Sequence, residues 1–402
     1  MPEVKPEIET FAKIKVVGVG GSGGSALNRM IQGKIRGVEF IAMNTDLQAL
    51  HYCLAPNKVQ LGRGVTRGLG SGMDPEMGRR GAEESQNEIR DALKGADMVF
   101  VTCGLGGGTG SGGAPVVAEI ARDSGALTVA VVTRPFSFEG AQRQDIAERA
   151  HSELVERVDT IITIPNDRIL QIIDKKTSLL DAFETVDDVL RQGVQGISEL
   201  ITIPGLINVD FADVKAIMSH AGSALMGIGR AAGETRAVEA AKSAIASPLL
   251  ELSIDGAKGI LFTISGGSSL SMHEVNEAAK IITGNADTHA KVIFGAVLDE
   301  SLKDEVKVTV IATGFSGAPQ PMPYLKTLGT PATVGASSYS APTFRDTAAK
   351  KEERAASQAQ RAFEVKTVRR EEQKSAPIKA ASKKEEEEDL EIPAFIRRKL
   401  GS

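Results

Sequence analysis

Short apolar runs alternate with more polar, amphipathic stretches from Lys13 to Pro165. The apolar runs are rich in Val and Ile, and they predict strands at 13–19, 38–44, 98–103, 126–133 and 160–165. The stretches between them predict helices at 25–33, 114–125 and 140–158, and one that ends near residue 97. Apolar strands that alternate with helices are typical of a parallel sheet covered on both faces, so the predicted fold class is α/β.

A long helix is predicted over 178–201. Its apolar residues recur every three or four positions: Leu179, Phe183, Val186, Leu190, Val194, Ile197 and Ile201. After it, strands at 259–265, 291–297 and 306–313 and a helix at 271–284 indicate a second, smaller domain. The predicted organisation is a parallel-sheet nucleotide-binding domain over 12–177, a central helix over 178–203 and an α+β domain over 204–316.

The two ends of the chain differ in composition from the part between them. Residues 1–11 are polar, and we expect them to be mobile. Residues 317–387 are rich in Ala, Ser, Lys, Glu and Gln with few large apolar residues, which predicts a disordered linker. The final stretch, 388–402, contains an apolar patch at Leu390–Ile396. Such a patch after a disordered tract is typical of a segment that docks on a partner.

Composition disfavours several classes of function. The net charge of −5 and the aromatic content of 4%, with no Trp, count against a nucleic-acid-binding surface. Cys53 and Cys103 form no CxxC motif or His cluster, so we expect them to be reduced and structural. No apolar run approaches the roughly 18 residues of a membrane span, and the N-terminus lacks the apolar core of a secretion signal. These features predict a cytoplasmic protein.

Two glycine-rich segments each follow a predicted strand and precede a predicted helix. They are Lys15–Ser25, KVVGVGGSGGS, and Gly104–Gly112, GLGGGTGSG. Glycine lets the backbone approach an anion closely, and a helix N-terminus adds partial positive charge. Two such segments in one domain predict a polyphosphate held from two sides. The sequence has no GxxxxGK[ST] motif, so backbone N–H groups, helix ends and Mg²⁺ must meet the phosphate charge.

A dinucleotide-binding enzyme is an alternative. Gly18–Gly23 also satisfies GxGxxG, and Asp46 follows the next predicted strand, where such sites place a carboxylate for the ribose. An NAD-dependent oxidoreductase therefore stays open. The second glycine segment counts against it, because a dinucleotide-binding domain needs one pyrophosphate loop.

The run Gly106–Gly112 closely resembles the signature of the tubulin and FtsZ superfamily of GTPases, and the resemblance extends over most of residues 12–316. It implies an enzyme that binds GTP and GDP and hydrolyses GTP. The nucleotide-binding residues that it implies are Gly20, Gly21, Ser22, Gly23, Gly24, Ser25, Asn44, Asp46, Gly70, Ser71, Gly72, Gly106, Gly107, Gly108, Thr109, Gly110, Thr133, Pro135, Glu139, Arg143, Asn166, Phe183 and Asp187. Ser22 and Ser25 stand where the family is richer in Gly and Asn, and both can donate a hydrogen bond.

The resemblance implies distinct roles for these segments. The first glycine segment holds phosphate, Glu139 and Arg143 contact the ribose, Phe183 stacks near the guanine, and Asp187 accepts hydrogen bonds from it. Guanine presents N1–H and its N2 amino group side by side, which suits a carboxylate. Simpler explanations stay open, namely a surface ion pair between Glu139 and Arg143, a turn at 165–167 and a core position for Phe183.

The segment Asn208–Asp213, NVDFAD, matches the catalytic loop of this superfamily and implies catalytic roles for Asn208, Asp210 and Asp213. In the family this loop completes the active site of the neighbouring subunit. Its carboxylates would orient a water while Mg²⁺, or a monovalent cation, offsets their repulsion from phosphate. Hydrolysis would then require a head-to-tail homopolymer, which forms open filaments. A plain helix cap is the alternative for these acids, and no side chain is assigned as a metal ligand.

The tail LEIPAFIRR resembles the C-terminal peptide of FtsZ-family division proteins. It implies that a membrane-tethering division adaptor binds Ile392, Pro393, Phe395, Ile396, Arg397 and Arg398. We therefore expect a filament-forming GTPase that scaffolds bacterial cell division under the inner membrane without inserting into it. Tubulin-like relatives that act in plasmid segregation or cell shape, and a filament protein that hydrolyses GTP negligibly, are the alternatives.

Overall fold

The computed structural model describes residues 12–171, 173, 177–203, 205–207, 209–247, 254–284 and 286–315. The predictions for residues 1–11, 317–387 and 388–402 lie outside these ranges, and so do the tail residues from Ile392 to Arg398 and the catalytic candidate Asn208.

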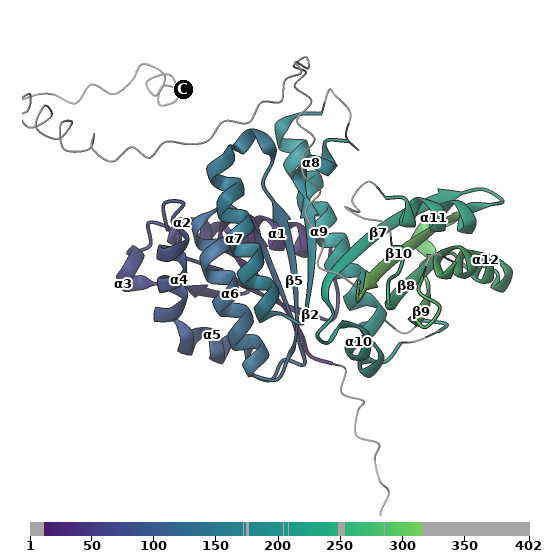
Figure 1. Ribbon diagram of the computed structural model, residues 1–402, viewed down its shortest axis with the longest axis horizontal. Helices are drawn as coiled ribbons and strands as arrows, with labels where there is room; N and C mark the ends of the chain where they lie inside the picture. Colours follow the sequence, from purple (N-terminus) through teal and green to yellow (C-terminus); the bar gives the residue numbers. More distant parts are fainter. Residues whose placement is uncertain are drawn as a thin grey trace, which may run out of the picture. The chain divides into compact units, whose positions relative to one another are not determined.

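Ten strands of the described residues form one sheet in the order β3-β2-β1-β4-β5-β6-β7-β10-β8-β9 (Figure 1). The strands are β1 (Ile14–Val19), β2 (Val38–Asn44), β3 (Asn57–Gln60), β4 (Met98–Gly104), β5 (Leu127–Arg134), β6 (Thr160–Pro165), β7 (Gly222–Ala232), β8 (Gly259–Gly266), β9 (Lys291–Leu298) and β10 (Glu305–Thr313). Strand β10 runs antiparallel to β7 and β8, and the other neighbouring pairs are parallel. The mainly parallel α/β architecture is confirmed.

The helices that the structure describes are α1 (Gly20–Gln32), α2 (Leu47–Tyr52), α3 (Arg63–Thr66), α4 (Pro75–Glu84), α5 (Gln86–Leu93), α6 (Gly108–Asp123), α7 (Ala141–Arg157), α8 (Asn166–Ile169), α9 (Leu179–Thr202), α10 (Phe211–Met218), α11 (Arg236–Ile245) and α12 (Met272–Thr283). Short 3₁₀ turns lie at Ser137–Glu139 and Glu300–Leu302. None of these helices combines the length and the apolar character needed to cross a membrane.

Both faces of the sheet are buried over β1, β4 and β5. Val16 belongs to a core cluster shared with α1 and α9, whereas its neighbour Val17 belongs to a cluster shared with α4, α5, α6 and α7. This alternation follows from the period of two along a strand and explains why the strands are apolar throughout. Most of the apolar stripe predicted for the long helix is buried, with Val186, Leu190 and Val194 in the first cluster, whereas Phe183 near its start is exposed.

The C-terminal half of the sheet carries its own core. Helices α11 and α12 pack over β7, β8 and β10, around Phe262, Ile264 and Val308. The buried guanidinium of Arg236 donates to Glu274 Oε1 at 2.7 Å and to the Asp304 carbonyl at 3.0 Å. This hydrogen-bonded ion pair holds the pKa of Glu274 at about 2. The strands and the helix predicted within 259–313 are confirmed.

The sheet differs from the prediction in three features, the first of which is that the short strand β3 was not predicted. Strand β7 was not predicted, because its sequence GSALMGIGRAA is rich in Gly and Ala and lacks the β-branched run of the other strands. Its pairing with β6, from Thr160 opposite Gly222, makes one continuous sheet of the two predicted domains.

Helices α1 and α6 begin earlier than predicted. Helix α1 begins at Gly20 rather than Ser25, and α6 begins at Gly108 rather than Ala114. Most of both glycine segments is therefore helical, although glycine alone disfavours a helix by about 1 kcal/mol per residue. Tertiary packing overrides that propensity.

The packing that favours glycine is a close contact between α4 and α6. A Cβ atom at Gly112 would overlap the Pro75 carbonyl and lie 2.6 Å from Arg79 N, and one at Gly108 would lie 2.7 Å from the Asp74 carbonyl oxygen. Both neighbours are backbone atoms, so they cannot turn aside. At Gly113, in contrast, the nearest atom would be Val19 Cγ1 at an ordinary 3.4 Å.

We expect Gly112→Ala to destabilise the protein by at least about 2 kcal/mol, because overpacking a rigid contact commonly costs this much. Gly113→Ala is the matched control on the same helix. It should be neutral or stabilising by up to about 1 kcal/mol, since alanine favours a helix and meets no clash there. Urea unfolding of both variants measures the difference, and equal stabilities would contradict the packing interpretation.

Candidate functional site

The N-termini of α1 and α6 meet where the strand order of the sheet reverses. Strand β2 lies on one side of β1 and β4 on the other, and the carboxyl ends of β1 and β4 lead directly into these helices. A Cβ atom at Gly20 would lie 3.0 Å from Gly110 N, so the two first turns touch. Gly20 also has a φ of +76°, which favours glycine. Ligands of α/β sheets bind at this kind of switch point.

Space is open beside both helix starts. A Cβ atom at Gly21 or Gly107 would meet no atom within 4 Å. Ser22, one of the two departures from the family pattern, accepts a hydrogen bond at 2.7 Å from Gly104 N and so ties α1 to the end of β4. Ser25, the other departure, lines a cavity of about 220 Å³ together with Gly20, Gly24 and Asn44.

The loop Gly70–Gly72 is held against α6 by hydroxyl groups. Ser71 Oγ lies 3.0 Å from Thr109 Oγ1, which lies 2.6 Å from Thr45 Oγ1. Within α6, Ser111 Oγ accepts from Gly106 N at 2.9 Å. Together with the Ser22–Gly104 contact, these hydrogen bonds bring the two predicted phosphate segments and the loop Gly70–Gly72 together at one edge of the sheet.

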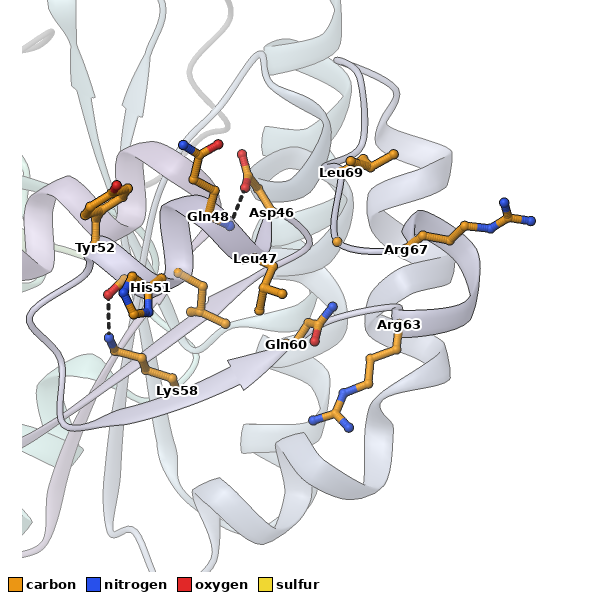
Figure 2. A pocket seen from close by; sticks show the side chains of 12 residues that line it. Asp46, Leu47, Gln48, His51, Tyr52, Lys58, Gln60, Arg63, Arg67 and Leu69 are labelled. Atoms are coloured by element: carbon orange, nitrogen blue, oxygen red, sulfur yellow. Dashed lines mark hydrogen bonds between the residues drawn. The ribbon is translucent and has the colours of Figure 1, made fainter. Parts of the chain in front are cut away.

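Asp46 caps α2, with Oδ1 accepting from Gln48 N at 2.9 Å and from Ala49 N at 3.1 Å. Figure 2 shows it at the rim of a cavity of about 850 Å³ between α2, β3 and α3, where Lys58 donates to the His51 carbonyl. Among the predicted nucleotide-binding residues, Asp46 lines this cavity. No residue of the two glycine segments lines it.

The predicted ribose segment is pre-organised by an ion pair. Arg143 donates to Glu139 Oε2 at 2.8 Å, and Glu139 Oε1 accepts from Phe136 N at 2.9 Å. The ion pair considered as the simpler explanation is therefore present. The end of β5 is tied to the second glycine segment as well, because Leu105 N donates to the Thr133 carbonyl at 2.9 Å. Pro135 follows β5 directly, and its Cγ would lie 3.3 Å from a Cβ at Gly106, which is closer than an ordinary van der Waals contact.

Asn166 follows β6 and is 6% exposed. Its amide oxygen is buried and has no hydrogen-bond partner among the described residues. Buried polar atoms without partners are rare, and such an acceptor is what a ligand N–H or O–H would satisfy. The neighbouring Asp167 Oδ1 accepts from Ser137 N at 2.9 Å, which fixes the ribose segment beside it.

Phe183 and Asp187 lie one helical turn apart near the start of α9. The Phe183 ring is 41% exposed and meets Phe136 edge to face at 5.6 Å, so it is a surface ring and not a core residue. Burial raises the pKa of Asp187 to about 6, against the opposing effect of Arg29. Arg29 is itself paired with Glu184 at 2.6 Å.

Asp210 and Asp213 lie at the other end of the sheet. Asp210 is the N-cap of α10 and accepts from Asp213 N at 2.8 Å, so the capping interpretation also describes the geometry. Strand β6 separates α10 from the nucleotide edge. Thr160, its first residue, donates to the Met218 carbonyl of α10, whereas Asn166, a predicted nucleotide-binding residue, follows its last residue. The 24 residues of α9 rise about 36 Å. Figure 1 shows α8 at one end of this helix and α10 toward the other. The structure therefore does not bring Asp210 or Asp213 to the glycine segments of the same chain.

Sequence analysis did not single out Thr45, Phe136 or Arg29. Thr45 lies between the predicted residues Asn44 and Asp46, and Phe136 follows Pro135, but their roles depend on partners that only the fold brings close. Arg29 pairs with a residue of α9 more than one hundred positions away. Within the described residues, no group of three or more His, Cys, Asp or Glu side chains could hold a metal ion.

Comparison with known proteins identifies relatives of both halves. Residues 13–174 match the GTPase domain of the tubulin/FtsZ family, and residues 222–316 match the C-terminal domain of the FtsZ family. An empty FtsZ dimer from M. jannaschii is 46% identical, with a TM-score of 0.73, over 76% of this chain and 89% of that chain. CetZ2 from Haloferax volcanii, a GTPγS-bound protofilament, is 22% identical with a TM-score of 0.64 over 75% of this chain and 92% of that one, and it shows the shared fold.

Lowering the pH from about 7 to about 5 should stabilise the wild type relative to Asp187→Asn. The folded-state pKa of about 6 exceeds the ordinary value of 3.8, so the folded protein keeps a proton that the unfolded chain has released. The stability that this carboxyl contributes is therefore full below the lower pKa and is lost as the pH rises through the higher one. The loss is about 3 kcal/mol over the whole range and about 1 kcal/mol between pH 5 and pH 7. Urea unfolding of both nucleotide-free proteins tests this, and a difference that does not change with pH would contradict it.

Proposed function

This chain belongs to the tubulin/FtsZ family of GTPases, and we propose that it hydrolyses GTP at head-to-tail junctions of a filament that scaffolds cell division. The carrying observation is the separation of Asp210 and Asp213 from the glycine segments, at opposite ends of α9. One subunit offers the nucleotide edge and the next offers the acidic loop, so the active site needs two copies. Such a heterologous contact builds an open filament.

Nucleotide binding is a property of the family, and the geometry supports specific roles. The phosphates would lie at the touching N-termini of α1 and α6, where Gly21 and Gly107 leave space and the helix ends supply partial positive charge. The guanine would lie against the exposed Phe183 ring, with the unpaired Asn166 oxygen and the Asp187 carboxylate accepting its N–H groups. Glu139 and Arg143 would contact the ribose.

The acidic loop supplies the catalytic groups in this proposal. Asp210 and Asp213 are both exposed, so they can reach a neighbouring subunit. Their carboxylates would orient and polarise the attacking water. A bound Mg²⁺ would supply positive charge to the developing phosphate charge, and its coordination would come mainly from phosphate and water oxygens, as Mg²⁺ prefers.

The division role rests on the tail, whose sequence LEIPAFIRR separates this chain from relatives with other duties. We propose that it binds a membrane-tethering adaptor and so places the filament at the division site, on the cytoplasmic face of the membrane. Plasmid segregation or cell shape is the second candidate, because those relatives share the GTPase core. The GTPase family assignment leaves no role for the NAD-dependent alternative.

Asp213→Ala should lower GTP turnover at least about 100-fold, the range that a positioned acid or base contributes, while GTP affinity stays at the wild-type value. Asp123→Ala, at an exposed acid near the end of α6, is the control and should retain activity. Phosphate release and equilibrium titration provide the two readouts.

The same turnover assay, run over a range of protein concentrations, tests whether the site needs two subunits. Wild-type turnover per subunit should rise with protein concentration, because the site exists only at junctions. A turnover that stays constant on dilution far below the assembly threshold would show that each subunit carries a complete site.

Deleting residues 388–402 should leave GTP turnover and filament formation in vitro near wild-type values, because every predicted GTPase motif lies before residue 317. In cells that lack the full-length protein, the truncated protein should fail to reach the division site. Fluorescence microscopy measures this, with Phe395→Ala as a point variant that keeps the chain length. Normal rings formed by the truncated protein would overturn the adaptor proposal.

A further inference from the structure

Thr45, at the end of β2, is a buried threonine that occupies the junction of four segments. It is 0% exposed, and its backbone carbonyl accepts from Thr66 Oγ1 at 3.2 Å and from Gly70 N at 3.3 Å. Its side-chain oxygen lies 2.6 Å from Thr109 Oγ1. Among the hydrogen bonds of the described residues, this is the one that the Thr45 hydroxyl makes.

Burial fixes the direction of this hydrogen bond. A buried hydroxyl that does not donate leaves an unsatisfied donor in the interior, which proteins avoid. Thr45 therefore donates, and Thr109 Oγ1 accepts. The Thr109 proton must then point elsewhere, toward Ser71 Oγ at 3.0 Å or toward the open space at the start of α6. Ser71 is half-buried, so solvent or a ligand can also satisfy its hydroxyl.

We propose that Thr45 is a positioning residue for the bound nucleotide. It holds the Thr109 hydroxyl in the orientation that presents its proton to a phosphate oxygen, and it does not touch the nucleotide itself. When Thr45 and Ser71 both donate, the two lone pairs of Thr109 Oγ1 are filled and its single proton is left for the ligand. The inference rests on the proposed assignment of Thr109 to the phosphate site.

The two branches of the Thr45 side chain have separate neighbours. The hydroxyl faces α6, whereas the methyl Cγ2 lies 3.2 Å from the position of a Cβ on Gly81 of α4. A packing role would depend on the methyl group, and a positioning role would depend on the hydroxyl. Valine keeps the methyl and loses the hydroxyl, and serine does the reverse.

Affinity for GTPγS and for GDP, titrated into the purified full chain below its assembly threshold, separates these roles. Thr45→Val should weaken both affinities roughly three- to tenfold, the ratio that one hydrogen bond of ordinary net strength supplies. Thr45→Ser should bind within about twofold of the wild type, because it keeps the donor. Thermal unfolding without nucleotide verifies that each variant folds. If the valine variant does not fold, the ratio between Thr45→Ser and Thr45→Ala isolates the hydroxyl.

A double-mutant cycle with Thr109→Val distinguishes failure of this inference from failure of the proposed site. Thr109→Val should weaken binding, and Thr45→Val added to it should weaken binding no further, because Thr45 acts through Thr109. Unchanged affinity in Thr109→Val would overturn the proposed phosphate site. Weak binding by Thr109→Val, combined with wild-type affinity in Thr45→Val or with a serine variant as weak as the valine variant, would overturn the role of Thr45.

Discussion

The close contact of glycine-lined backbones at the carboxyl ends of β1 and β4 is the constraint on which the site depends. Helices α1 and α6 touch at Gly20 and Gly110, and α4 meets α6 where Gly108 and Gly112 lie against its first turn. A side chain at these positions would separate the helices and move their N–H groups apart. The glycines thus serve packing first. Space for a phosphate follows from it, because Gly21 and Gly107 are left facing open volume.

Helix α9 fixes the second constraint, which is distance. It begins beside the exposed Phe183 ring and the Asp187 carboxylate, and it ends near the opposite edge of the sheet, where Asp210 caps α10. Its buried stripe joins the core that it shares with α1 and β5, and a continuous helix keeps its two ends apart. A chain built this way separates the nucleotide edge from the acidic loop, and a second subunit is the simplest means of bringing them together.

Sequence patterns predicted the parts of this structure that depend on local order. The apolar strands, the stripe of α9 and the glycine signature were visible as periodicity or as a run of one residue type. Strand β7 was missed because its Gly and Ala residues suit close packing on α11 more than they suit any local propensity. The early starts of α1 and α6 were missed because tertiary contact, not helix propensity, makes glycine favourable there. The roles of Thr45 and Arg29 needed the fold, since their partners are distant in sequence.

The proposed phosphate site would use dipoles where many phosphate sites use a lysine. Helix ends, backbone N–H groups and the Thr45–Thr109–Ser71 hydroxyls are neutral donors, so their strength depends on orientation and not on net charge. Arg29 is paired with Glu184, which leaves the half-buried Asp187 with weak compensation and a raised pKa. A ligand with paired N–H donors would hydrogen-bond the Asp187 carboxylate and offset its desolvation. A ligand that presents an acceptor there would leave the carboxylate without a partner. In the proposed site, discrimination between bases would come from the cost of an uncompensated carboxylate. Retention of phosphate would come from donors whose directions the packing of α1, α4 and α6 has already fixed.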